Sequence, residues 1–288
     1  MPSISKGLAQ LFDSPPFQGT EANLLRMLPP GPEPTGTGDL LTEGPNYIIC
    51  YTPRSGSTHL ISLLQHTGIL GKPADFFNLQ YISLPLDAEQ VYLATGCHDI
   101  GNACKLQTVV GVEDYLRSVA ITRTPNGVFG MKSDLYQASI LMRRGLFHGP
   151  RIQWKYISIT REDVLMQGIS YYKAIETGIW TSRSGSASAD CPFDEDKILQ
   201  CMRTIAGISC GWEQAFGLFG IRPLRLTYEQ LAANPRATIA RVADFVGVPY
   251  TLADLLPISD YGKQRLPEQE QWANIIRART GGFDSPQS

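Results

Sequence analysis

The junction between an apolar run at residues 47–51 and the helical pattern from about Ser57 to Thr67 constrains the fold of this chain most. The run predicts a buried strand, and the pattern after it predicts an amphipathic helix. Further strands are predicted at 127–133, 154–161 and 222–228, and helices at 111–124, 134–144, 163–178 and 194–219, with two more broken at Pro235. Strands that alternate with helices predict an α/β fold, a central parallel sheet flanked by helices.

The short turn after the first strand contains the residues Arg54, Ser55, Gly56, Ser57 and Thr58. A helix N-terminus carries unpaired N–H groups and positive partial charge, and a glycine lets the backbone approach an anion closely. In a simpler interpretation Ser57 or Thr58 caps the helix, which explains only one hydroxyl. The turn therefore predicts a cradle for a phosphate-type anion.

The loop differs from that of the P-loop kinases, which need Gly-x-x-x-x-Gly-Lys-Ser/Thr. Here the lysine after the glycine is absent, the loop is shorter, and no acidic residue at a strand end stands out as a magnesium ligand. A kinase is therefore a weaker alternative.

Composition excludes several other classes of protein. The formal net charge is −2 over 288 residues, whereas nucleic-acid binders carry a basic excess. No apolar run approaches the roughly 18 residues of a membrane span, and the first residues lack a secretory signal pattern, so we expect a cytoplasmic protein. The six cysteines form no Cys-x-x-Cys pair, and Cys97, His98 and Cys104 lack an evident fourth ligand, so we expect reduced thiols and no metal.

Three stretches carry a family resemblance: "TPRSGSTHL" at 52–60, "GKPADFF" at 71–77 and "ITREDVLMQGISYYKAIETGIW" at 159–180. Together they resemble the sulfotransferases that use 3′-phosphoadenosine-5′-phosphosulfate (PAPS), in particular the mycobacterial trehalose 2-sulfotransferase branch. The resemblance runs in patches over 47–277. It implies a P-loop-like three-layer sulfotransferase fold over 47–288. The many prolines and glycines of residues 14–46 separately predict a poorly structured arm, or a lid, at 1–46. The unfamiliar region 79–127 is expected to build the acceptor pocket.

The resemblance implies roles for the loop and for nearby cations. The segment Ser55–Thr58 would grip the 5′-phosphate of PAPS, and Arg54 would neutralise the bridging and sulfate oxygens. Lys132, at the end of a predicted strand, is a second candidate cation, although a solvated lysine is an equal alternative. PAPS would be the donor, adenosine 3′,5′-bisphosphate (PAP) the product, and no metal would be needed.

The resemblance assigns the 3′-phosphate of the nucleotide to Arg161 and Ser170. A guanidinium forks onto phosphate oxygens and a hydroxyl adds a donor. The alternative for Arg161 is a salt bridge to the next two residues. The first of these, Glu162, stands where the branch often has a second arginine. A basic C-terminal segment with Lys263 and Arg265 would close over the nucleotide, or would simply be a solvated loop.

The acceptor must lose a proton as it attacks, and a carboxylate within reach can take it. The resemblance places this role on Asp75, where the branch has a glutamate. His59, on the first turn of the helix after the loop, is the rival base. Because Asp75 is shorter than a glutamate, the acceptor is left open between trehalose and another small molecule.

The sequence thus predicts an enzyme that sulfates a hydroxyl, amine or guanidine of a small molecule, a sugar or a secondary metabolite. A non-catalytic phosphoadenosine-binding protein of the same fold is the other alternative. A homodimer is expected from the resemblance alone.

Overall fold

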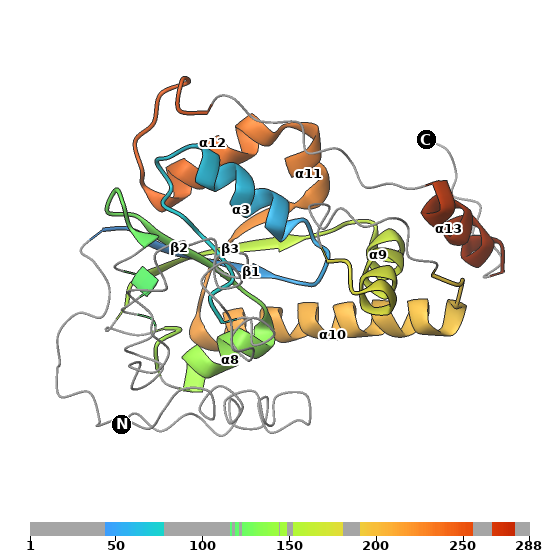
Figure 1. Cartoon of the computed structure of the whole chain (residues 1–288). Coiled ribbons are helices and arrows are strands. Elements are labelled where there is room, and N and C mark those ends of the chain that lie inside the picture. The colour runs from blue at the N-terminus through green and yellow to red at the C-terminus, as the bar shows by residue number, and fades with distance from the viewer. Residues whose placement is uncertain are drawn as a thin grey trace, which may run out of the picture.

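The computed structural model describes residues 44–77, 116, 119–120, 123–143, 145–148, 152–180, 191–255 and 267–279 (Figure 1). Four parallel strands form the central sheet in the order β2-β1-β3-β4. They are β1 (Asn46–Tyr51), β2 (Phe129–Ser133), β3 (Trp154–Thr160) and β4 (Leu224–Thr227). Each lies within the strand predicted from the sequence or extends it by one residue. The predicted α/β class and parallel sheet are therefore confirmed.

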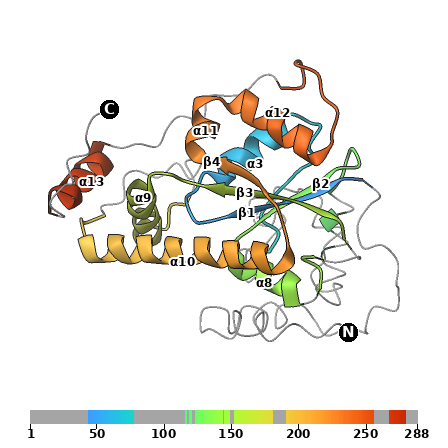
Figure 2. The ribbon, with the colours of Figure 1, turned by 180° about the vertical axis from the view of Figure 1, so that it is seen from behind.

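Helices cover both faces of the sheet (Figures 1 and 2). One face carries α3 (Ser57–His66), α11 (Tyr228–Ala233) and α12 (Pro235–Val246). The other carries α8 (Leu135–Arg143) and α10 (Glu195–Phe219). At the sheet's edge α9 (Val164–Thr177) packs on α10, and α13 (Pro267–Arg279) packs on α9. The break predicted at Pro235 separates α11 from α12.

The apolar run of β1 is continuous because both faces of this strand are buried. Tyr47, Ile49 and Tyr51 pack in the core cluster shared with α3 and α12. Ile48 and Cys50 pack in the cluster shared with α8 and α10. Because alternate side chains point to opposite faces, a strand covered on both faces must be apolar throughout.

The register brings the carboxyl ends of the central strands together. Cys50 pairs with Ser133 on β2 and with Ser158 on β3. Residues that follow these positions therefore gather at one edge of the sheet, the edge at which open α/β sheets bind their ligands.

Parts of the predicted organisation lie outside the described residues. The arm at 1–46 and most of 79–127 belong to these parts, although Asn46 lies in β1 and Leu116, Val119 and Ala120 are helical and buried. The domain division stays a prediction. In the described part of the chain no helix is long and apolar enough to cross a membrane.

Candidate active site

The loop between β1 and α3 adopts the conformation of an anion cradle. Gly56 is the N-cap of α3, with φ 85°, and no described side chain caps this helix. The capping interpretation of Ser57 and Thr58 is therefore wrong, because glycine fills the cap position. The buried Ser55 Oγ has no hydrogen-bond partner among the described residues. The Ser55 hydroxyl and the N–H groups in the first turn of α3 are hydrogen-bond donors that suit an anion.

A buried glutamine holds this loop against α9. Gln167 Nε2 donates hydrogen bonds to Thr52 Oγ1 at 2.9 Å and to the Pro53 carbonyl at 2.7 Å. The next residue, Arg54, has φ 63°, a left-handed conformation that is unfavourable for a side chain with a Cβ. The clamp by Gln167 helps to keep the loop in this conformation.

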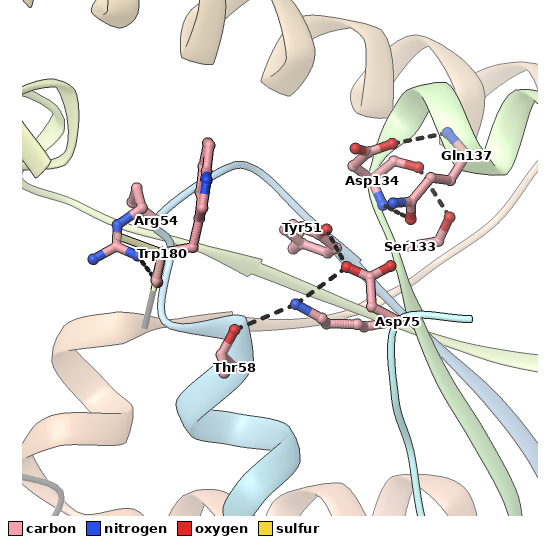
Figure 3. Close-up of polar contacts among 9 residues, drawn as sticks. Tyr51, Arg54, Thr58, Asp75, Ser133, Asp134, Gln137 and Trp180 are labelled. Atoms are coloured by element: carbon pink, nitrogen blue, oxygen red, sulfur yellow. Dashed lines mark hydrogen bonds and ion pairs between the residues drawn. The ribbon is translucent and has the colours of Figure 1, made fainter. Parts of the chain in front are cut away.

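The Arg54 side chain contacts α9 and the chain that follows it; Figure 3 shows the contact with Trp180. The Arg54 Nε donates to Ser170 Oγ at 2.9 Å, and its Nη1 donates to the Trp180 carbonyl. Burial, and then the charge of Arg161, lower the pKa of Arg54. From the sequence, Arg54 and Ser170 were expected at different ends of the nucleotide, whereas here they are in direct contact.

Arg161 lies at the end of β3 with its guanidinium over the Tyr228 ring, 5.0 Å from the centroid. The backbone N–H groups of the next two residues, Glu162 and Asp163, donate hydrogen bonds to Glu229 on α11. The Asp163 carboxylate caps α9 and lies 3.8 Å from Arg277. Arg161 lies close enough to lower the pKa of Arg54, so the positive charges of the two arginines act on the same region.

Tyr228 also closes the site at Gly56, where an added Cβ would lie 2.6 Å from the tyrosine Cδ2. Gly56→Ala should therefore displace the ring that supports Arg161, in addition to the strain of roughly 1–2 kcal/mol for a left-handed residue. We expect lower stability and an affinity for PAP reduced by about tenfold or more, measured by urea unfolding and calorimetry.

The matched control is Gly247→Ala, with φ 87° and no atom within 4 Å of the added Cβ. This variant should lose similar stability and keep its affinity. Equal affinities of the two variants would contradict a role of the loop in binding.

A second cluster, which includes Tyr51, Thr58 and Asp75 (Figure 3), lies beside the loop. The residue at its centre is Lys132. Its Nζ lies 3.4 Å from Asp75 Oδ2 and donates to Thr58 Oγ1 at 3.3 Å. Tyr51 OH donates to the same carboxylate oxygen at 2.9 Å, and the ammonium lies 4.6 Å from the Tyr51 ring centroid. Because Lys132 is buried, the solvated alternative for it is wrong. A carboxylate and a buried ammonium thus lie beside the loop between β1 and α3.

The segment 71–77 runs alongside β2 and so brings Asp75 to Lys132. Ala74 forms a parallel bridge with Met131, and the Lys132 N–H donates to the Ala74 carbonyl at 2.9 Å. The position of Asp75 therefore depends on this backbone pairing.

A family model described as Stf0 sulphotransferase matches residues 46–279. The chain belongs to the Stf0 sulphotransferase family. The recognition made from the three sequence stretches is confirmed, and the protein is a sulfotransferase.

Two relatives are similar to the chain in sequence, and two solved structures are similar to it in fold. The trehalose 2-sulfotransferase of Mycobacterium tuberculosis is 26% identical to the chain, over 83% of this chain and 97% of its own length. The trehalose 2-sulfotransferase of Mycolicibacterium smegmatis is also 26% identical, over 80% of this chain and 94% of its own length. The sulfotransferase domain from the curacin biosynthetic pathway has a TM-score of 0.50 at 17% identity, over 77% of this chain and 80% of that one. The sulfotransferase domain from the Synechococcus PCC 7002 olefin synthase has a TM-score of 0.50 at 15% identity, over 90% and 94%. The predicted sulfotransferase fold is confirmed.

The structure describes one of the three remaining predicted residues of this sulfotransferase, His59. His59 lies on the first turn of α3, where burial lowers the pKa of its imidazole and so favours the neutral form. Lys263 and Arg265 lie outside the described residues, as do Cys97 and Cys104. Among the residues that the structure describes, no cluster of His, Cys, Asp or Glu could hold a metal ion.

Sequence reasoning assigned no site role to Tyr51. This residue ends a parallel strand, and a polar residue at such a position is the signal that could have found it. Gln167 was noted only as part of the resemblance. The contribution of Trp180 is a backbone carbonyl, which no sequence pattern indicates.

Proposed function

We propose that this sulfotransferase moves a sulfuryl group from PAPS to a hydroxyl or amine-type nitrogen of a small molecule. The observation that carries the proposal is the contact between Thr58 of the anion loop and Lys132, which also pairs with Asp75. It supports the proposal because a loop suited to an anion, a buried cation and a carboxylate lie side by side.

The residues present fit the nucleotide. Ser55 offers a buried hydroxyl with no partner in the described structure, and Gly56 lets the backbone turn tightly against the Tyr228 ring, where a side chain would clash. Two arginines, 54 and 161, lie close enough for one to lower the pKa of the other, and an anion between them would relieve that repulsion. Arg161 and Ser170 would hold the 3′-phosphate, while the loop would hold the 5′ end.

PAPS supplies an activated sulfuryl group bonded to phosphate through one bridging oxygen. Asp75 accepts the proton of the acceptor as the new bond to sulfur forms. Lys132 and Arg54 balance the negative charge that develops when the bridging bond breaks and its electron pair stays with the phosphate. The protein thus provides alignment and electrostatic stabilisation for an in-line displacement.

The acceptor class is proposed from the relatives and from one difference. The two mycobacterial relatives are named for trehalose, so a sugar hydroxyl is the first candidate. Asp75, in place of the branch's glutamate, favours an acceptor that sits differently, such as a secondary-metabolite alcohol, amine or guanidine. The homodimer and the cytoplasmic location stay predictions.

Calorimetric titration without magnesium tests the donor. PAP should bind with micromolar affinity, whereas AMP and ADP should bind much more weakly, because only PAP carries the 3′-phosphate. Equal or absent binding of the three nucleotides would contradict the proposal. Normal PAP binding with no transfer to any acceptor would favour the non-catalytic alternative.

A further inference from the structure

Tyr51 is the last residue of β1, and its side chain contacts two other segments of the site (Figure 3). Its hydroxyl donates to Asp75 Oδ2 at 2.9 Å, and the Lys132 ammonium lies 4.6 Å from its ring centroid. Lys132 comes from β2, and Asp75 comes from the segment 71–77 that pairs with β2. One tyrosine side chain therefore contacts both the proposed base and the proposed cation.

The core of the protein holds Tyr51 in place. Only 9% of the residue is exposed, and its side chain packs in the cluster shared with α3 and α12. From the other face of the sheet, Trp212 Nε1 on α10 donates to the Tyr51 carbonyl at 3.0 Å. A side chain that is already fixed can hold its partners with little further loss of conformational entropy.

The hydroxyl of Tyr51 acts on the Asp75 carboxylate. A hydrogen bond to an ionised acceptor is stronger than one between neutral groups, and it fixes the orientation of the acceptor. A hydrogen bond of this kind also stabilises the ionised form of a carboxyl group, which is the form that can take up a proton. The contact at 2.9 Å therefore keeps Asp75 oriented and ready to act as a base.

The ring of Tyr51 acts on the Lys132 ammonium. When Asp75 takes up the acceptor's proton it becomes neutral, so Lys132 loses its charged partner at 3.4 Å, which is unfavourable for a buried ammonium. The other carboxyl group drawn in Figure 3, that of Asp134, accepts the Gln137 N–H at 2.8 Å at the start of α8. The face of an aromatic ring, by contrast, attracts a cation whatever the protonation state of a neighbouring carboxyl group.

We propose that Tyr51 is a positioning residue of the transfer reaction, whose hydroxyl holds the Asp75 carboxylate and whose ring keeps the Lys132 ammonium in place while Asp75 is protonated. This inference rests on the proposed function. It predicts that the hydroxyl and the ring contribute separately to turnover and contribute little to nucleotide binding.

Two variants test these contributions: Tyr51→Phe removes the hydroxyl and keeps the ring, whereas Tyr51→Leu removes both. The measurements are release of PAP from PAPS, with trehalose and with water as acceptors, and calorimetric titration with PAP. Tyr51→Phe should lower kcat by about tenfold, the scale of a hydrogen bond to a charged group, and Tyr51→Leu by about three- to tenfold more. The KM for PAPS and the affinity for PAP should stay almost unchanged in both variants.

Tyr47→Phe is the matched control, because it removes a buried hydroxyl from the same strand and the same face of the sheet. The Tyr47 hydroxyl donates to the Leu70 carbonyl at 2.7 Å. Urea unfolding should show a loss of stability in both phenylalanine variants, but only Tyr51→Phe should lose turnover.

A double-mutant cycle distinguishes positioning of Asp75 from a general structural role. In the Asp75→Asn background the side chain at position 75 takes up no proton, so Tyr51→Phe should lower the remaining turnover much less than in wild type. Difference infrared spectroscopy adds a readout that needs no acceptor. The carboxylate band that is lost in Asp75→Asn should shift in Tyr51→Phe and stay in place in Tyr47→Phe.

The outcomes separate the two proposals. A normal rate in Tyr51→Phe, or an equal loss of rate with and without Asp75, would overturn the inference while the proposed function stands. An equal loss of rate in Tyr47→Phe would also overturn it, because the effect would then be structural. If wild type binds PAP but releases none from PAPS, the proposed function fails and the inference fails with it, whatever the infrared band shows.

Discussion

Replacement of Asp75 by asparagine is expected to lower turnover by about 10²-fold or more and to leave the affinity for PAP almost unchanged. The asparagine can still accept the hydrogen bond from Tyr51, so the segment along β2 should keep its place, but it cannot accept the acceptor's proton. Steady-state kinetics with PAPS measures the turnover, and calorimetry measures the affinity for PAP. A large loss of turnover with an unchanged affinity for PAP would identify Asp75 as the base.

Two further variants make this test specific. Asp75→Glu restores the side chain expected from the family and should retain much of the activity. His59→Gln should leave turnover within a few-fold of wild type. A large loss in the His59 variant would make the histidine the base. Loss of PAP binding in Asp75→Asn would instead assign Asp75 to the fold.

The second large effect is expected at Arg161. Its replacement by alanine should remove the preference for 3′-phosphorylated nucleotides, so that PAP and AMP bind about equally. A charge-assisted bidentate contact contributes about 1.5–3 kcal/mol, or about 10- to 10²-fold in affinity. Parallel titrations with PAP and AMP measure the preference directly.

Arg225→Ala is the matched control for this prediction. Arg225 is an exposed arginine on β4 that pairs with Glu213 at 2.6 Å, and its loss should leave both affinities unchanged. Arg54→Ala should weaken PAP and AMP alike. If Arg161→Ala does the same, then both arginines hold one phosphate, and the assignment of Arg161 to the 3′ end is wrong. The comparison of the two variants is needed because Arg54 contacts Ser170, the residue that is assigned together with Arg161 to the 3′-phosphate.

The fold could be predicted from the sequence because its signals are local. Runs such as Tyr47–Tyr51 are apolar throughout since both faces of the strand are buried, and the glycine at position 56 indicates the tight entry into α3. The Lys132–Asp75 pair could not be predicted, because its members lie 57 positions apart and meet only through the pairing of 71–77 with β2. The spacing Asp134 to Gln137 is a readable capping signal, but burial of that carboxyl group depends on packing.

The spacing of contacts along α9 limits how the length of this region can vary. Asp163, Gln167 and Ser170 are separated by four and three positions, so they lie on one side of the helix. From that side Gln167 holds the loop backbone and Ser170 meets Arg54. One inserted residue between them would rotate everything beyond it by about 100° and separate the two contacts. Related sequences that share this site should therefore tolerate exchanged side chains on the far side of α9 but neither insertions nor deletions between these positions.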